Sequence, residues 1–200
     1  MEFLSFFPLV SFLFLVISLI IRIMYLREKG IKVSSKKNKK PRFLKIIYPV
    51  FALIFLLWMA ELPRLAFHFS YPVLPELLIK NQLNFQLLQV AGAIVVVLAL
   101  FFWILTLFHF RFSLRFGLDD KNQGELITGG IFSRSRNPFF LSIDLFFVGL
   151  AMFHTSLFFL VMALLTLVSV HFFILKEEKF LRKHYGEAYQ KYREKVGRYF

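Results

Sequence analysis

Long apolar stretches alternate along the chain with short stretches that are charged or contain proline. Residues 3–26, 43–62 and 85–110 are each apolar over about the length that an α-helix needs to cross a bilayer. Two further apolar runs lie within residues 139–175, and the polar link His154–Thr155–Ser156 between them is short enough to predict a helical hairpin. The pattern therefore predicts an all-α fold, a polytopic membrane helix bundle with about five transmembrane helices.

Two segments depart from this pattern. Residues 62–80 contain three prolines, beginning with Pro63, and a proline inside a helix removes a backbone hydrogen bond. This segment is therefore predicted to be interfacial or re-entrant. Residues 176–200 are charged with spaced aromatic side chains, which predicts an amphipathic helical tail that Gly186 divides into two short helices.

Composition and charge support a membrane location. The chain is 58% hydrophobic with 29 Phe and no Cys, which excludes disulfides and thiolate metal sites. Its net charge of +13 comes from Lys and Arg in three blocks beside apolar runs, without a base-stacking module, so a bilayer explains the charge better than a nucleic acid. Residues 27–45, 111–137 and 176–200 carry nine, five and eight Lys and Arg residues. The segments on the other side of the predicted spans carry only Arg64 and Lys80. Five spans with the N-terminus outside place all three basic segments in the cytoplasm.

The segment 128–140, just before the hairpin, is the first candidate for chemistry. Gly129 and Gly130 permit close approach of the backbone to a ligand, and Arg136 supplies a fixed cation. Pro138 is suited to the first position of a helix, where it leaves neighbouring N–H groups free. The alternative is a plain turn with orienting arginines and a helix-start proline.

Acidic residues and histidines in and after the hairpin are the next candidates. Glu177–Glu178 follows the last apolar run, where the pair either neutralises adjacent lysines or binds a cationic ligand. Asp144 and His171 fall at similar depths in an antiparallel hairpin, and an Asp inside a membrane costs roughly 2.5–3.5 kcal/mol, so a partner or a polar cavity is expected. A structural pair that fixes the hairpin register is the alternative. His109 is predicted to be interfacial, and no spacing resembles a metal site.

Together these segments resemble the isoprenylcysteine carboxyl methyltransferase and phospholipid methyltransferase family of integral membrane enzymes. That family is marked by a Gly-x-Tyr…Arg-His-Pro-x-Tyr segment before a hairpin, then a Glu-Glu pair, then a Tyr-Gly-x-x-Tyr-x-x-Tyr…Gly-Arg tail. The matching residues here are 126–140, Glu177–Glu178, Tyr185–Tyr192 and Gly197–Arg198, and the resemblance covers about residues 105–200.

Three positions depart from the family pattern. Asn137 replaces the usual His, and an amide still donates and accepts hydrogen bonds. Phe132 and Phe140 replace tyrosines, which removes two hydroxyl groups from the expected site.

The resemblance implies an S-adenosylmethionine-dependent methyltransferase with its cofactor on the cytoplasmic side. Residues 1–110 then provide membrane spans, with basic loop 27–45 and interfacial segment 62–80, and residues 111–200 form the cofactor-binding catalytic region, with hairpin 139–175 and tail 176–200. The cofactor-binding residues that it implies, with Glu177 near the cofactor's amino group, are Leu126, Gly130, Ile131, Phe132, Arg136, Asn137, Pro138, Phe140, Glu177 and Glu178. The candidate catalytic residues are Arg136, Asp144 and His171.

The methyl acceptor is expected to be lipidic or a small hydrophobic molecule that arrives from the bilayer, and the sequence leaves its identity and the oligomeric state open. Two alternatives remain. One is a reductase similar to the NADPH-dependent membrane sterol and steroid reductases, which share a Gly-x-Tyr…Arg-His-Pro-Asn-Tyr segment, although this chain has Phe139 at the family's Asn position. The other is a non-catalytic lipid-binding membrane protein.

Overall fold

The computed structural model describes residues 2–31, 44–70, 74–83, 85–110, 114 and 125–200. Most of the predicted basic loop 27–45 and the first part of the polar segment 111–137 lie outside the described residues. The helices that it contains, in chain order, are η1 (Glu2–Phe6), α1 (Phe7–Glu28), α2 (Leu44–Phe67), α3 (Glu76–Ile79), α4 (Gln86–His109), η2 (Gly130–Ser133), α5 (Pro138–Phe153) and α6 (Leu157–Lys195).

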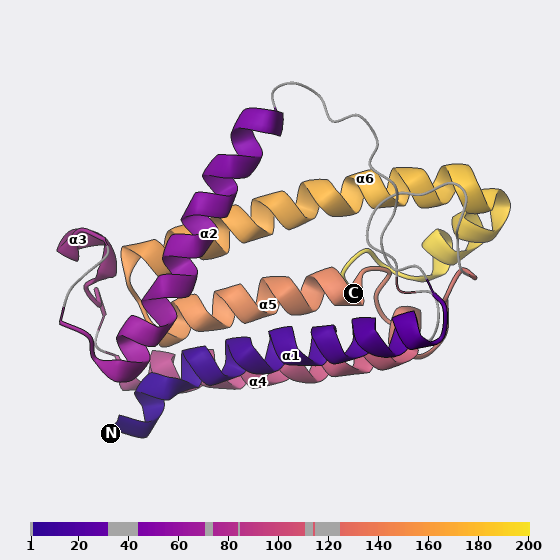
Figure 1. The fold of residues 1–200 in the computed structure, drawn as a ribbon. Helices are drawn as coiled ribbons and strands as arrows, with labels where there is room; N and C mark the ends of the chain where they lie inside the picture. The colour runs from indigo at the N-terminus through magenta and orange to yellow at the C-terminus, as the bar shows by residue number, and fades with distance from the viewer. Residues whose placement is uncertain (1, 32–43, 71–73, 84, 111–113, 115–124) are drawn as a thin grey trace.

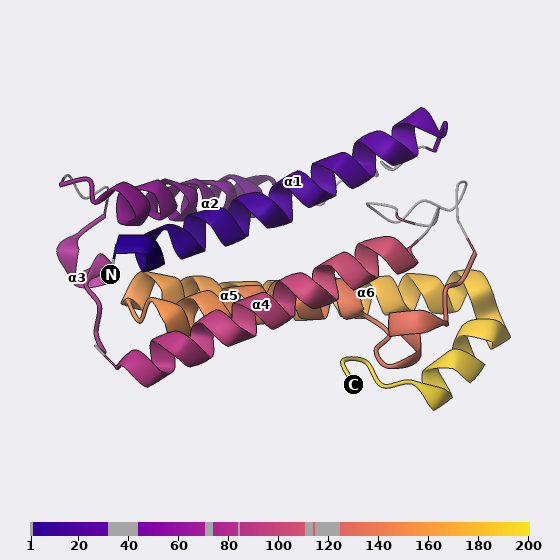
Figure 2. The ribbon, with the colours of Figure 1, turned by 90° about the horizontal axis from the view of Figure 1, so that it is seen from below.

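The helices form a bundle in which α5 is packed between α4 and α6 (Figures 1 and 2). Helix α1 lies along α4, whereas α2 crosses the bundle obliquely and contacts η1, α1 and α6. One end of the bundle holds η1, α3 and the link between α5 and α6. The opposite end holds the start of α5 and the C-terminal tail, which folds back beside it (Figure 2).

The outer surfaces of the helices are apolar. Ile21 on α1, Val97 on α4 and Phe172 on α6 are all more than half exposed, which is costly in water and favourable in lipid. Four helices are long and apolar enough to cross a membrane, and the fifth, α5, is apolar but has only 16 residues, or about 24 Å of helix. The described residues therefore confirm a polytopic, all-α membrane protein.

Close packing between α4 and α5 depends on two glycines. A Cβ added to Gly92 would lie 2.4 Å from the backbone N of Phe153, and one added to Gly149 would lie 2.8 Å from the backbone N of Val96. The two helix backbones are therefore in direct contact, as small residues allow in membranes. This contact fixes α5, and so the start of α5, relative to α4.

Two helices extend beyond the apolar runs that predicted them. Helix α2 continues through Pro63 to Phe67, so the first part of segment 62–80 is helical. Helix α6 continues through the charged residues to Lys195. It is interrupted at Gly186, whose φ of 52° is non-helical, as the predicted division of the tail requires.

Candidate active site

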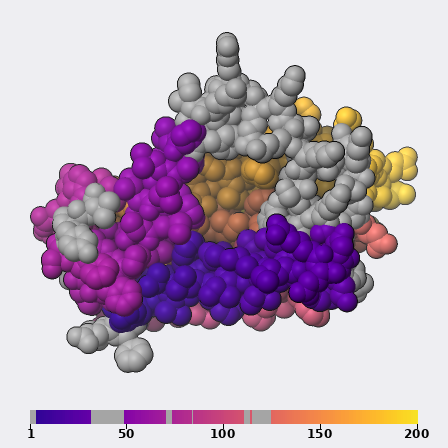
Figure 3. All heavy atoms as spheres, viewed as in Figure 1, coloured from indigo at the N-terminus to yellow at the C-terminus, as the bar shows by residue number. Residues whose placement is uncertain are grey.

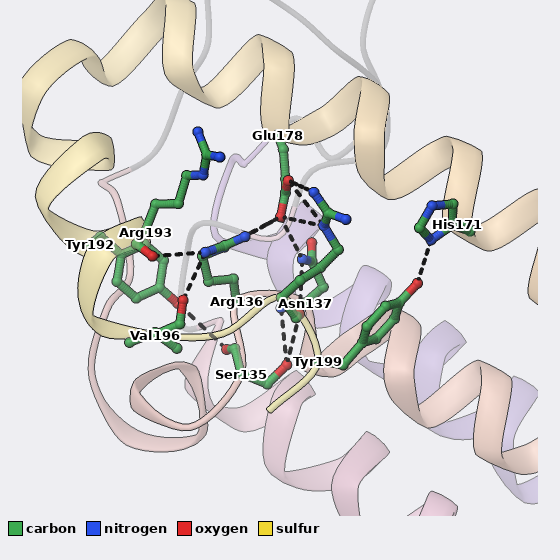
Figure 4. Close-up of polar contacts among 10 residues, drawn as sticks. Ser135, Arg136, Asn137, His171, Glu178, Tyr192, Arg193, Val196 and Tyr199 are labelled. Atoms are coloured by element: carbon green, nitrogen blue, oxygen red, sulfur yellow. Dashed lines mark hydrogen bonds and ion pairs between the residues drawn. The ribbon is translucent and has the colours of Figure 1, made fainter.

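The candidate site is assembled where the segment that enters α5 meets the tail. Pro138 is the first residue of α5, as predicted, because its ring favours the first turn and its missing N–H is not needed there. The break at Gly186 turns the last part of α6 back toward this segment (Figure 4). Residues about 60 positions apart in the sequence thereby come into contact.

Glu178 is the centre of a buried polar cluster, which we call the Glu178 network and which comprises Arg136, Asn137, Glu178 and Arg198 (Figure 4). The Glu178 side chain is 8% exposed. Arg136 Nη2 donates to Glu178 Oε1 at 2.8 Å, and Arg198 Nη2 donates to Oε2 at 2.9 Å. Asn137 Nδ2 makes a longer contact with Oε1, at 3.4 Å, and donates to the Arg198 carbonyl at 3.2 Å. One carboxylate thus joins the start of α5 to the chain's C-terminal segment.

The rest of the Arg136 side chain binds the end of α6. Its Nη1 donates to the carbonyls of Val196, at 2.7 Å, and Arg193, at 3.0 Å. Carbonyls at a helix C-terminus lack helical partners and carry partial negative charge, so a guanidinium is favourable there. Each Arg136 side-chain nitrogen therefore has a protein partner. These bonds hold the start of α5 against the end of α6.

Tyr192 makes the second connection between these segments. The Tyr192 hydroxyl donates to the Phe132 carbonyl at 2.6 Å, next to its contact with the Ser135 carbonyl. Ser135 Oγ in turn donates to the Arg198 carbonyl at 3.4 Å. Phe132 itself is buried, with its ring edge-to-face against Phe110, so the missing hydroxyl at this position is replaced by an aromatic contact.

The two adjacent glutamates experience opposite electrostatic surroundings. Burial acts to raise the pKa of Glu178, but hydrogen bonds from Arg198 and Arg136 outweigh it and hold the pKa below its usual range. Glu177 is half-buried and forms no ion pair with a described residue. Burial, and then the charge of Glu178, raises the pKa of Glu177 to about 7.

Tyr189 lies beside these glutamates and carries an unsatisfied group. Its side chain is 1% exposed and packs with Tyr192, Val196 and Leu126. Within the described part of the chain, its hydroxyl has no hydrogen-bond partner. Burial, and then the charge of Glu178, raises the pKa of this hydroxyl to about 12, so it is a neutral donor. A buried hydroxyl without a partner is uncommon and calls for an explanation.

Comparison with protein families identifies the chain. Residues 87–188 match the model of the family described as phospholipid methyltransferase, which is just over half of the chain. The chain belongs to the phospholipid methyltransferase family. No curated protein and no solved structure matches it.

The family match covers α4, α5, η2 and most of α6, together with Arg136, Asn137 and Glu178. It ends at residue 188, before Tyr189, Tyr192 and Arg198. The contacts of these tail residues are therefore observations of this structure, and the family match does not include the residues that make them. Of the enzyme classes that the sequence left open, the match is to the membrane methyltransferases.

The structure changes the interpretation of the paired glycines. A Cβ at Gly130 would lie 2.0 Å from the His109 ring, and its φ of 63° also favours glycine. Gly130 is thus needed for packing against His109, whose Nδ1 contacts the Leu105 carbonyl at 2.7 Å. At Gly129, in contrast, no atom of the described residues lies within 4 Å of the position a Cβ would take. The open side of this turn is at Gly129.

The remaining predicted cofactor residues take different positions. Leu126 packs against the cluster formed by Tyr189, Tyr192 and Val196. Ile131 is half-buried in η2. Phe140 packs against Phe173 of α6, with 5.7 Å between ring centroids, and therefore lies on the hairpin side.

His171 contacts a residue that the sequence did not indicate, Tyr199, and Asp144 is close to this pair. His171 Nδ1 and the Tyr199 hydroxyl are 2.9 Å apart, and their rings are stacked (Figure 4). Burial, and then the charge of Asp144, raises the pKa of the Tyr199 hydroxyl, so Asp144 is close to this pair. Asp144 is buried, and its Oδ1 has no hydrogen-bond partner among the described residues.

Arg198 and the tail tyrosines belong to the motif on which the resemblance rests, but the spacing of that motif does not predict which residues they contact. The ion pair of Arg198 with Glu178 could be inferred only if the fold of the tail were known. Tyr199 has no such signal, because it follows the Gly197–Arg198 motif and is not part of it.

Proposed function

We propose that this protein transfers a methyl group from S-adenosylmethionine to a lipid acceptor within the membrane. Membership of the phospholipid methyltransferase family supports methyl transfer on lipids. The observation that carries the assignment of the site is the buried, unpartnered Tyr189 hydroxyl beside Glu177, next to the Glu178 network.

The residues present around Tyr189 fit the cofactor. Its ammonium group requires a carboxylate that is not already paired, which Glu177 provides and Glu178 does not. The hydroxyl groups and ring nitrogens of the cofactor require hydrogen-bond donors, which Tyr189 Oη and the backbone supply. Between Leu126 and Gly129, no backbone N–H donates to another backbone group that the structure describes. These groups would hold the cofactor.

Bound there, the cofactor supplies a methyl group on a sulfonium, which is already a good leaving group. The chain's own task is then to align donor and acceptor and to exclude water. In this proposal Arg136, Asn137 and Arg198 act through Glu178, because they fix the segment that enters α5 against the tail. We therefore assign Arg136 to positioning, within the set of residues first predicted as catalytic.

Asp144, His171 and Tyr199 form the acceptor side of the proposed site. An amine or thiol acceptor loses a proton when it gains a methyl group, whereas a carboxylate acceptor does not. Asp144 has an unpartnered oxygen to take a proton or to orient the acceptor, and the His171–Tyr199 contact holds the tail against the hairpin.

The surface supports a lateral route for the acceptor. Figure 3 shows a hollow between α1 and α2, with atoms of α5 and α6 at its floor. The surrounding helices present apolar side chains outward, such as Leu53 on α2, which is 58% exposed. A lipid can therefore approach the hairpin from the bilayer while the charged cofactor approaches from water.

Calorimetry on detergent-purified protein tests the cofactor. S-adenosylhomocysteine should bind, and a reduced nicotinamide dinucleotide should not. Binding of the dinucleotide instead would favour the reductase, and binding of neither would favour a non-catalytic lipid-binding protein. Labelled S-adenosylmethionine, added to membranes that contain the protein, then identifies the acceptor by whether the label is found in lipid, protein or a volatile product.

Replacing Asp144 by Asn and His171 by Gln tests the acceptor side. Each change should lower turnover of the identified acceptor and leave S-adenosylhomocysteine affinity unchanged. Unchanged turnover in both variants would remove these residues from the mechanism without affecting the cofactor assignment.

A further inference from the structure

A pocket lies at the end of the bundle opposite the Glu178 network. It has a volume of about 430 Å³ and lies between η1, the end of α2 and the link between α5 and α6. We call it the His154 pocket. Its polar wall is formed by Ser5, Arg64, His68, Gln89 and His154, and residues such as Leu65 and Phe153 form its apolar wall.

The polar wall of the His154 pocket contains one guanidinium, that of Arg64, and two imidazoles. Arg64 is held by Glu61, which is 1% exposed, through its Nε and Nη2 atoms. Among the described residues, Arg64 Nη1 has no hydrogen-bond partner, and neither does the buried Nε2 of His154. Arg64 Nη1 is therefore available on the pocket wall to an acceptor oxygen of a ligand. Burial lowers the pKa of His154, so its ring is neutral, and with its N–H toward the Ile79 carbonyl it leaves Nε2 as an acceptor.

His68 adds a second, independent observation. Its φ is 54°, in the left-handed region that glycine favours, and it lines the same pocket. This conformation caps the C-terminus of α2, where the Phe69 N–H donates to the Arg64 carbonyl at 3.2 Å. Glycine would satisfy the backbone better, so the imidazole is the feature that this position provides.

An apolar groove continues from the His154 pocket along α4. It has a volume of about 330 Å³, is lined by Val90, Ile94 and Val97, and shares Leu4, Gln89 and Phe153 with the pocket. We call it the α4 groove. From Gln89 to Leu98 it follows about 14 Å of helix toward the middle of the bundle. A polar pocket at a helix end, joined to an apolar groove that runs inward, has the shape and polarity of a membrane lipid.

We propose that the His154 pocket and the α4 groove bind one phospholipid, with its phosphate against Arg64 and His68 and an acyl chain along α4. Phosphate oxygens accept from guanidinium and imidazole donors. Helix α5, about 24 Å long, separates this site from the Glu178 network. A lipid bound here is therefore a resident of the fold and is not the methyl acceptor.

Photocrosslinking tests this site in the full-length, detergent-purified protein. The probe is phosphatidylglycerol with a diazirine in one acyl chain, and diacylglycerol with the same chain lacks the phosphate. We expect phosphatidylglycerol to label residues 89–98 at least fivefold more than diacylglycerol does. Equal labelling of this segment by the two probes would overturn the proposal.

Three variants make the test specific. Val97 and Val168 are both 56% exposed, but only Val97 lines the α4 groove. Val97→Trp should lower labelling at least fivefold, and Val168→Trp should not. His68→Gly relieves the backbone and so retains the fold, yet it should lower labelling severalfold. Unchanged labelling in both Val97→Trp and His68→Gly would contradict the site.

An arm with inorganic phosphate distinguishes a lipid from a free anion. Phosphate at millimolar concentration should compete only weakly with the lipid probe, because it lacks the acyl chain. Binding of inorganic phosphate without labelling of residues 89–98 by the lipid probe would overturn the lipid as the occupant. None of these readouts depends on methyl transfer.

Discussion

At the scale of single residues, α6 turns the side chains of Glu177 and Glu178 into different surroundings. Successive residues of a helix differ in direction by about 100°. Glu178 therefore faces two guanidiniums and remains ionised, whereas Glu177 is half-buried without an ion-pair partner, beside Tyr189. Glu178 therefore has a structural task, and Glu177 is available for a cation.

The pKa of Glu177 predicts a pH dependence of cofactor binding. Its pKa is raised to about 7, so the carboxyl is protonated below that pH. Because an ammonium group binds the ionised form, affinity for S-adenosylhomocysteine should rise by up to about tenfold per pH unit as pH increases toward 7, and level off above it. Calorimetry between pH 5.5 and 8, chosen to bracket that pKa by about one unit or more, measures this.

Glu177→Gln should abolish the rise and leave affinity low at every pH. Glu187→Gln is the matched control, because Glu187 is an exposed carboxylate on the same tail. If Glu177→Gln retained the wild-type pH profile, Glu177 would not be the partner of the ammonium group.

Tyr189 and Tyr192 predict opposite effects of the same substitution. Tyr189→Phe removes a buried hydroxyl without a partner, so the free energy of unfolding should rise by about 1 kcal/mol while S-adenosylhomocysteine affinity falls. Tyr192→Phe removes a donor to the Phe132 carbonyl, so the free energy of unfolding should fall by about 1 kcal/mol. Denaturant unfolding in detergent and calorimetry measure the two quantities. Loss of stability in both variants would indicate that Tyr189 is only structural.

At the scale of elements, the contact between α4 and α5 positions the start of α5. Gly92→Ala and Gly149→Ala each place a Cβ within 3.0 Å of backbone atoms of the other helix. Separating the helices should lower the free energy of unfolding by about 1–3 kcal/mol. Gly129→Ala is the control, since a Cβ there would have no described atom within 4 Å and its φ of −100° suits alanine. Equal stability of all three variants would show that α4 and α5 adjust without cost.

Helix order was predictable from the sequence, but helix ends were less so. The apolar runs located α1, α4 and the α5–α6 hairpin, because lipid imposes a minimum length on each span. Pro63 was expected to end α2, yet the helix continues to Phe67. Packing against η1 and the ion pair between Glu61 and Arg64 stabilise this last turn, and neither is visible in a hydropathy pattern.

At the scale of the whole molecule, the candidate site depends on contacts between distant parts of the chain. The sequence indicated Arg136, Asn137 and the glutamates from a resemblance, and the family match includes them. It did not indicate that Glu178 binds two arginines or that Tyr199 reaches His171. Both contacts require the tail to fold back at Gly186, and a spacing in sequence does not specify that direction.

The whole molecule also has an orientation, which the basic residues predict. With no Cys in the sequence, single cysteines report which side of the membrane each position faces. Leu77, in α3, is 74% exposed, and Thr155, in the hairpin link, contacts Leu83 beside the start of α4. Cysteines at these two positions should react with an impermeant maleimide on intact cells. Glu187→Cys should react only in inside-out vesicles, because three spans separate it from Leu77.

The Thr155 position decides whether the short helix α5 crosses the membrane. A cysteine there that reacts on the same side as Glu187→Cys would mean that α5 and α6 do not span as a hairpin. Detergent-solubilised protein, in which all three positions should react, is the control for accessibility. Reaction of Leu77→Cys only in inside-out vesicles would reverse the orientation and place the Glu178 network outside. It would then contradict a cytoplasmic supply of the cofactor, because S-adenosylmethionine is charged and does not cross the bilayer unaided.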